Sequence, residues 1–146
     1  GAGAEFALGC DLIVAAQDAR FGFPEVGVGL SVTGGISALL PNTVGLVRAK
    51  ELLFLGEYLG ADEALRLGLV NKVVPDGTHE QAALELANRL AAQPPAALAL
   101  AKSLLDYGVD ATVPDAFDRE VDAAIATMST GESQAGAQAF RAKSGG

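Results

Sequence analysis

The sequence predicts an α/β fold in which a mixed first part is followed by an all-helical second part. Before residue 77, short apolar runs bounded by turn residues alternate with segments of helical periodicity. After that turn only helical patterns remain. Of the 146 residues, 50% are hydrophobic, so the chain can bury a real core. We expect a partial α/β core over residues 1–77 and a helical C-terminal region over residues 78–146.

In the first part, helical and extended patterns follow one another at short intervals. A helix is expected to begin at Glu5, and Gly27 to Gly35 mark a glycine-rich loop. A further helix runs from Val44 to a glycine C-cap at Gly56, and another covers residues 62–68. Strands are expected, from β-branched and apolar composition, at residues 12–14, 20–23 and 69–74.

The second part reads as four helices, over residues 78–92, 96–107, 114–130 and 132–143. Thr78 and Gln81 have the spacing of a capping box, and Pro94 and Pro95 separate the first two helices. These helices carry apolar faces that so small a sheet region cannot cover, so we expect subunit contacts there. The apolar positions include Leu84, Ala87, Leu90, Ala91, Phe117, Val121, Ala124 and Met128.

Composition excludes several classes of protein. The net charge is −8 and the ten Lys and Arg residues are scattered, which argues against nucleic-acid binding. No apolar stretch reaches the roughly 18 residues of a membrane span, so we expect a soluble, cytoplasmic protein. The single cysteine, Cys10, is expected to be a buried apolar residue, and the lone His79 to be a surface residue. No metal-ligand cluster is apparent. The chain opens on a glycine-rich turn without an initiator Met, so we expect part of a longer protein.

Two carboxylates stand among apolar and small residues, Glu5 in GAGAEFALGCD and Glu25 in FGFPEVGVGL. A buried carboxylate must be paired, hydrogen-bonded or protonated, so two in one apolar region suggest acid/base chemistry. Each also has a structural explanation. A helix start favours Glu5 by about 0.3–1 kcal/mol, and a residue after proline in a turn, like Glu25, is often simply solvated. Spacing alone does not decide whether the two side chains converge.

Residues 1–30 resemble the enoyl-CoA hydratase/isomerase, or crotonase, superfamily, whose pattern runs GGG-x-E-L-x-x-x-C-D and then A-x-F-x-x-P-E-x-x-x-G. Residues 45–75 resemble the family's next helix, its G-x-x-x-x-A-x-E-A-x-x-x-G-L-V segment and the following strand, and AFRAK resembles its A-F-x-x-K segment. The match covers nearly the whole chain and about the C-terminal half of a typical member. It implies the C-terminal part of a crotonase-like ββα spiral, followed by an all-helical oligomerisation region.

The resemblance also implies roles for individual residues. In family hydratases two glutamates hold a water that adds to C3 of a trans-2-enoyl-CoA while C2 is protonated. Glu5 then orients and activates the water, and Glu25 donates the proton to C2. The backbone N–H of Ala2 is one of two donors to the enolate oxygen. Phe140 and Lys143 match the aromatic and lysine that reach the CoA of a neighbouring subunit. The alternative for Lys143 is a solvated lysine, because a cation is favoured at the end of a helix without any ligand.

Some family features are absent or altered. The second oxyanion donor and most of the CoA pocket come from the family's first half. The family's P-G-x-G-G becomes Val32-Thr33-Gly34-Gly35, so Thr33 replaces a glycine in a substrate pocket expected to include Gly29, Thr33, Gly34 and Gly35. The expected partners are an acyl-CoA substrate and a homotrimer or hexamer, with no cofactor beyond the substrate's CoA. Two alternatives stay open, an enoyl-CoA isomerase or other crotonase-family acyl-CoA reaction, and an inactive fragment or oligomerisation module.

Overall fold

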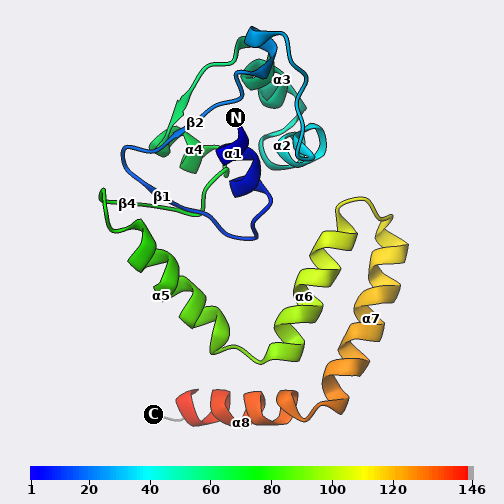
Figure 1. Ribbon diagram of the computed structural model, residues 1–146. Coiled ribbons are helices and arrows are strands. Elements are labelled where there is room, and N and C mark those ends of the chain that lie inside the picture. The colour runs from blue at the N-terminus through cyan, green and yellow to red at the C-terminus, as the bar shows by residue number, and fades with distance from the viewer. Residues whose placement is uncertain (145–146) are drawn as a thin grey trace. The chain divides into compact units, whose positions relative to one another are not determined.

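A computed structural model describes residues 1–144, with side chains through residue 142 (Figure 1). Its contacts divide the chain into two compact units, one of Gly1–Leu86 and one that begins at Ala87. The division falls inside helix α5 (His79–Ala91). Each unit has its own packing and is described separately.

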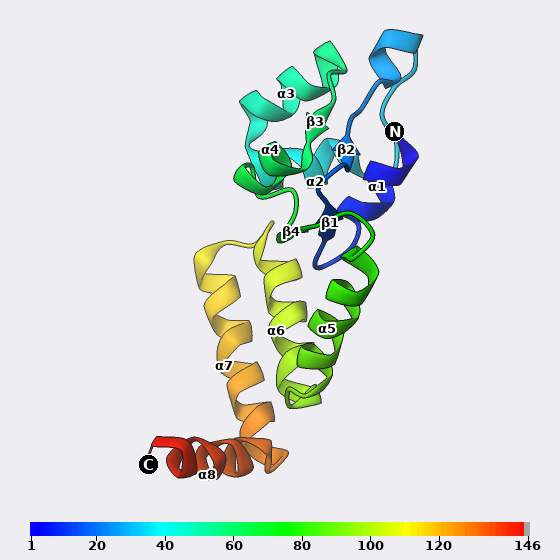
Figure 2. The same ribbon diagram turned by 90° about the vertical axis from the view of Figure 1, so that its left-hand side faces the viewer.

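The first unit gathers short helices around two small strand pairs (Figures 1 and 2). Strand β1 pairs in parallel with β4, with Val14 opposite Lys72, and β2 pairs antiparallel with β3. In chain order the elements before α5 are α1 (Ala2–Leu8), β1 (Val14–Ala16), β2 (Arg20–Phe21), the 3₁₀ helix η1 (Glu25–Val28), α2 (Ile36–Val44), α3 (Leu46–Leu55), β3 (Leu59–Gly60), α4 (Ala61–Arg66) and β4 (Lys72–Val74).

Several expected boundaries were wrong. The first helix begins at Ala2 rather than Glu5, and the strand expected at residues 12–14 lies at Val14–Ala16. Helix α2 was not expected, because its sequence contains Pro41 and follows a run of glycines. The helix expected from Val44 begins instead at Leu46, because Gly45 takes φ 80° and ψ 153°, a conformation that interrupts a helix and favours glycine.

Buried residues of α2, α3 and α4 make up much of the core of the first unit. Phe23, Ile36 and Leu40 are its largest fully buried side chains. Helix α1 joins this core through Ala4 and Leu8, which lie four positions apart and therefore on one face of the helix. The remaining buried members are Ala15, Phe21, Ala49, Leu52, Leu59, Ala61, Ala64, Leu69 and Val70.

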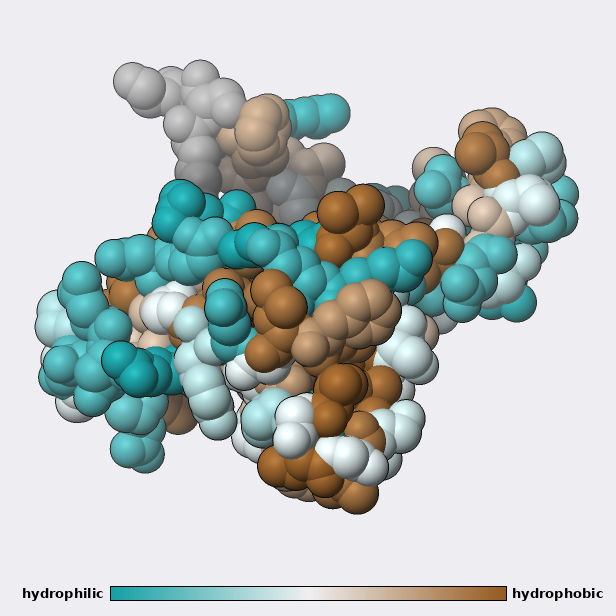
Figure 3. All heavy atoms as spheres, turned by 90° about the horizontal axis from the view of Figure 1, so that it is seen from above, coloured by the Kyte–Doolittle hydropathy of each residue, from teal (hydrophilic) through white to brown (hydrophobic). Residues whose placement is uncertain are grey.

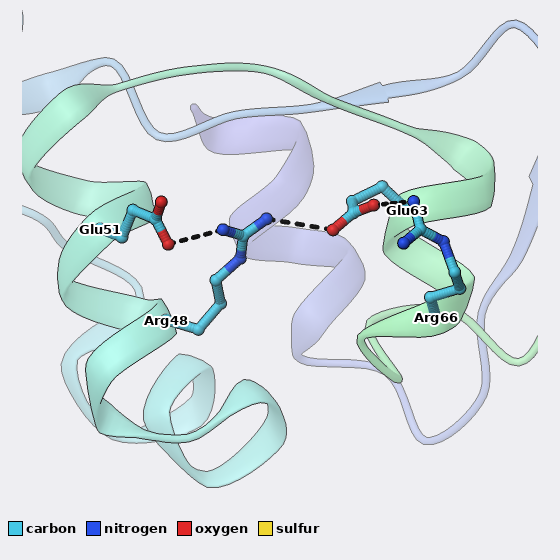
Figure 4. Close-up of polar contacts among 4 residues, drawn as sticks. All are labelled: Arg48, Glu51, Glu63 and Arg66. Atoms are coloured by element: carbon cyan, nitrogen blue, oxygen red, sulfur yellow. Dashed lines mark hydrogen bonds and ion pairs between the residues drawn. The ribbon is translucent and has the colours of Figure 1, made fainter.

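An ion-pair network links α3 to α4 (Figure 4). Arg48 on α3 donates to Glu51 at 2.5 Å and to Glu63 on α4 at 3.1 Å, and Arg66 donates to the same Glu63 carboxylate. Hydrogen bonding to Glu51 raises the pKa of the Arg48 guanidinium, so this group stays charged. The network ties the helix after Gly45 to the segment that leads to β4.

The second unit consists of α6 (Pro95–Gly108), α7 (Val113–Ser129) and α8 (Glu132–Ser144), with the end of α5. Thr112 caps α7 by accepting from the Asp115 N–H at 3.3 Å. Helices α6 and α7 pack side by side, and the Glu132 carboxylate accepts from the backbone N–H groups of Ala96 and Ala97 at the start of α6.

An apolar face of α7 is largely uncovered in this unit. It consists of positions three or four apart on one side of the helix, and these are between 44% and 83% exposed. Figure 3, which looks onto the first unit, shows that apolar residues also lie exposed between polar ones there. The exposed members are Val113, Phe117, Val121, Ile125 and Met128, called the α7 apolar face below.

Two local expectations were wrong and one was confirmed. Thr78 and Gln81 do not form a capping box, because the Thr78 hydroxyl donates to the Pro75 carbonyl and the Gln81 amide to Glu85. Cys10 is exposed, and its thiol donates to the Phe6 carbonyl. His79 is exposed, as expected. Over the described residues, every helix is too short or too polar to cross a membrane.

Candidate functional site

Glu5 lies in the first turn of α1, next to the face that packs into the core. Ala4 and Leu8, which are one helical turn apart, contact the core. Glu5 follows Ala4 and therefore lies at the border of this core-facing side, where it is half-buried. Its backbone N–H donates to the Gly1 carbonyl at 3.2 Å. Helix packing therefore holds the Glu5 backbone, and the direction of the carboxylate depends on what it meets outside the helix.

The segment Thr33-Gly34 contacts the Glu5 side chain from the loop before α2. The Thr33 hydroxyl lies 3.1 Å from Glu5 Oε2 and 3.3 Å from Oε1, and donates to the carboxylate. Gly34 has φ +61°, and a Cβ placed there would lie 3.0 Å from Glu5 Oε2 and 3.2 Å from Glu5 Cβ. Gly34 is therefore required both by its left-handed backbone and by the closeness of Glu5.

Glu25 begins the 3₁₀ helix η1, directly after two anchored residues. Phe23 is 1% exposed and Pro24 is the N-cap of η1. The buried side chain and the fixed φ of proline together restrict the backbone conformation just before Glu25. The Glu25 carbonyl accepts from the Leu30 N–H at 2.9 Å, which closes the loop. The Glu25 side chain is only 14% exposed, and its Oε2 is buried without a hydrogen-bond partner among the described residues.

Gly1 connects the two glutamates. Its nitrogen lies 3.7 Å from Glu25 Oε1 and donates to the Gly22 carbonyl, while its carbonyl accepts from Glu5. The Glu25 carboxylate thus approaches the residue that precedes α1, one helical turn before Glu5. Although 20 residues apart in sequence, both carboxylates approach the start of the same helix.

The two carboxylates have different surroundings. Glu5 accepts a hydrogen bond from the Thr33 hydroxyl. Glu25 is more enclosed, and one of its oxygens has no donor. An unpartnered buried polar atom is costly and in native proteins often marks a catalytic group or a bound molecule. The two carboxyl groups therefore lie in unlike surroundings.

The other expected site residues are placed as follows. Ala2 is the first residue of α1, so its N–H has no carbonyl one turn earlier in the helix to accept it. Gly29 and Gly35 are left-handed, with φ +76° and +79°; a Cβ on Gly29 would meet open space and one on Gly35 would meet Leu39. Thus Thr33 and Gly34 contact Glu5. Gly29 is instead the C-cap of η1, and Gly35 is the N-cap of α2.

Phe140 lies on α8 in the second unit and is 72% exposed. Lys143 lies near the end of the same helix, and its side chain falls outside the described residues. Within the described residues, no group of three or more His, Cys, Asp or Glu side chains could hold a metal ion. The contact between Thr33 and Glu5 was not foreseen, because no local pattern links residues 28 positions apart.

Comparison with known proteins agrees with the motifs. The model of the family described as enoyl-CoA hydratase/isomerase matches residues 1–145. A short-chain-enoyl-CoA hydratase of Clostridium acetobutylicum is 38% identical over 140 residues, which are 96% of this chain and 54% of that protein. A short-chain-enoyl-CoA hydratase of Clostridioides difficile is 33% identical over 95% of this chain and 90% of its own sequence.

Solved structures give the same result for the fold. The crystal structure of an enoyl-CoA hydratase/isomerase from Cupriavidus metallidurans CH34 matches with a TM-score of 0.93 at 40% identity, over 98% of this chain and 54% of that one. This chain therefore has a crotonase-like α/β fold and spans about half the length of the C. acetobutylicum and C. metallidurans proteins. On its sequence motifs, its fold and these matches, the chain belongs to the enoyl-CoA hydratase/isomerase family.

Proposed function

We propose that this chain carries the proton-transfer part of an enoyl-CoA hydratase, which adds water in the syn sense to a trans-2-enoyl-CoA. The observation that carries the proposal is the approach of Glu25 to the residue that precedes the helix of Glu5. Relatives named short-chain-enoyl-CoA hydratase and crotonyl-CoA hydratase support the substrate class.

In the proposed reaction Glu5 orients a water and accepts a proton as the water oxygen bonds to C3. The π electrons of the C2–C3 bond move toward the thioester carbonyl, whose oxygen becomes an enolate. Glu25 then protonates C2 as the enolate collapses to the thioester. One proton enters Glu5 and one leaves Glu25, so the substrate gains one water. Glu5 then releases its proton to solvent and Glu25 takes one up, which restores both carboxyl groups for the next turnover. The Thr33 hydroxyl holds the Glu5 carboxylate, and the Glu25 side chain is only 14% exposed.

The Ala2 N–H supplies one donor to the enolate oxygen in this proposal. It stands at the exposed start of α1, where the helix dipole also favours negative charge. The glycine-rich residues Gly29, Gly34 and Gly35, with Thr33, line the acyl pocket beside it. The reaction requires no metal or separate cofactor, because CoA enters as part of the substrate.

We also propose that the chain forms the C-terminal part of the family fold and that a preceding segment completes the oxyanion hole and CoA pocket. The 54% coverage of the C. acetobutylicum relative supports this. Phe140 and Lys143 are proposed to reach the CoA of a neighbouring subunit in a trimer or hexamer. The exposed α7 apolar face supports a subunit contact, since apolar surface of that kind is stabilised by burial.

Replacing Phe117 on the α7 apolar face, which is 63% exposed, tests the oligomer. Phe117→Glu is expected to shift the protein toward monomers in sedimentation velocity, because a carboxylate in an apolar contact loses its hydration. Glu120→Gln, a change on the same helix outside this face, serves as the control. A wild-type protein that sediments as a monomer would contradict the proposed assembly.

Glutamine substitutions test the chemistry in protein made from the complete coding frame. Glu25→Gln is expected to lower kcat for crotonyl-CoA hydration by orders of magnitude with little change in binding of the CoA ester, because it removes the proton donor. Glu57→Gln, at an exposed position in the same unit, should retain full activity. Near wild-type turnover by Glu25→Gln would remove Glu25 from the mechanism. The 146-residue chain alone is expected to be inactive, and hydration by it above background would overturn that part of the proposal.

The same variants separate the alternatives. An isomerase of this family works with one carboxylate at the position of Glu25, so Glu5→Gln would then leave double-bond migration intact. Having both glutamates therefore favours hydration. An inactive assembly module would show no turnover of any enoyl-CoA in the complete wild-type protein, and would still form the oligomer.

A further inference from the structure

We propose that Thr33 is a positioning residue that holds the Glu5 carboxylate in its working direction. The inference rests on the proposed function of Glu5 and assigns to Thr33 a task other than lining the acyl pocket. It derives from contacts between the loop before α2 and the first turn of α1.

The Thr33 hydroxyl reaches both oxygens of the carboxylate, at 3.1 Å and 3.3 Å. A donor placed almost equally between the two oxygens opposes rotation of the carboxylate about its terminal bond. The hydroxyl supplies a single proton, so it occupies a small part of the carboxylate's capacity, which is about four acceptor sites. The remaining sites stay available for a water molecule.

Thr33 itself is held by the core. Its carbonyl accepts from the Ile36 N–H at 3.1 Å, and Ile36 is 0% exposed. The preceding residue, Val32, packs against the same core. Threonine is also β-branched, which restricts its χ1 angle. These contacts hold the Thr33 backbone and restrict its side-chain rotamer, although the residue itself is exposed.

Gly34 adds a second restraint on the same side chain. Its backbone comes so close that a Cβ there would lie 3.2 Å from Glu5 Cβ. Thr33 thus directs the end of the Glu5 side chain, while Gly34 limits where its stem can lie. A residue without a side-chain hydroxyl at position 33 could not make this hydrogen bond.

Two substitutions at position 33 and one matched control test the assignment in protein from the complete coding frame. Thr33→Val removes the hydroxyl at nearly constant volume, and Thr33→Ser retains it. Thr43→Val is the control, because the Thr43 hydroxyl donates to the Leu39 carbonyl in the same unit. Selective ¹³C labelling of glutamate carboxyl carbons reports the surroundings of Glu5, and Glu5→Gln identifies its signal.

The Glu5 carboxyl signal is expected to move in Thr33→Val, to stay at the wild-type position in Thr43→Val, and to return toward it in Thr33→Ser. For crotonyl-CoA, Thr33→Val should lower kcat roughly three- to tenfold at unchanged KM, the size of one net hydrogen bond, with recovery in Thr33→Ser. A Glu5 signal that does not move in Thr33→Val overturns the assignment, as does an unchanged kcat in an active enzyme. If the wild-type protein hydrates no enoyl-CoA, the proposed function fails and the carboxyl signal alone decides the contact.

Discussion

Replacing Gly34 by alanine is expected to lower turnover by about tenfold or more, with a stability loss no larger than that at an unrelated left-handed glycine. Gly34 has φ +61°, and the added Cβ would lie 3.0 Å from Glu5 Oε2 and 3.2 Å from Glu5 Cβ. The first of these atoms is the end of a flexible side chain and can move, whereas the second belongs to its stem. The Glu5 carboxylate must therefore shift by a few tenths of an ångström.

The stability cost comes from the backbone. A left-handed conformation costs an L-residue roughly 1–2 kcal/mol. Alanine also lowers the conformational entropy of the unfolded chain relative to glycine, and this offsets about 0.4–1 kcal/mol of that cost. The net loss is about 1 kcal/mol, or roughly 2–4 °C in Tm for a chain of this size. Because catalytic groups tolerate little displacement, kcat should fall by about tenfold or more.

Gly77→Ala provides the matched comparison. Gly77 has φ +77°, and a Cβ there would meet nothing within 4 Å. Both variants should therefore lose similar stability in thermal unfolding, and only Gly34→Ala should lose turnover in a crotonyl-CoA hydration assay. Equal turnover in the two variants would refute the reasoning that the backbone at residue 34 restrains Glu5.

Three further substitutions probe the scaffold. Leu40→Ala, at a side chain that is 0% exposed, should lower the free energy of unfolding by about 2–5 kcal/mol, read from a urea titration; a loss below about 1 kcal/mol would contradict its place in the core. Thr112→Ala should cost about 1 kcal/mol, because Asp115 N–H loses its cap, and Thr112→Ser should recover most of it. Arg48→Met should lower Tm by separating α3 from the Glu63 carboxylate on α4, and an unchanged Tm would show that this ion pair contributes nothing measurable.

Elements with strong local signals could be predicted. The helices of the second part agree with the periodic pattern to within a residue or two, because an amphipathic repeat with proline or glycine at its ends needs no distant partner to be recognised. The strand before Pro75 was also foreseen, although β4 is confined to Lys72–Val74. Its neighbours Leu69 and Val70 are 2% exposed and lie in the core without joining a ladder.

Helix α2 shows where local signals fail. Pro41 lowers the helical propensity of its segment, and Gly34 and Gly35 before it read as loop. Ile36 and Leu40 lie one turn apart and are both 0% exposed, so burial against the rest of the first unit stabilises a helix that propensity disfavours. The exposure of Cys10 is likewise a result of packing that an apolar neighbourhood in sequence did not reveal.

By itself, the sequence determined the family of this protein, its division into mixed and helical parts, and the two glutamates proposed for its chemistry. Those properties depend on residue type, spacing and periodicity, which are local. Only the tertiary structure decided that β1 pairs with β4, that Glu25 approaches the start of α1, and that Thr33 donates to Glu5. These contacts join residues 24 to 58 positions apart, and they form because burial of the shared core brings their elements together.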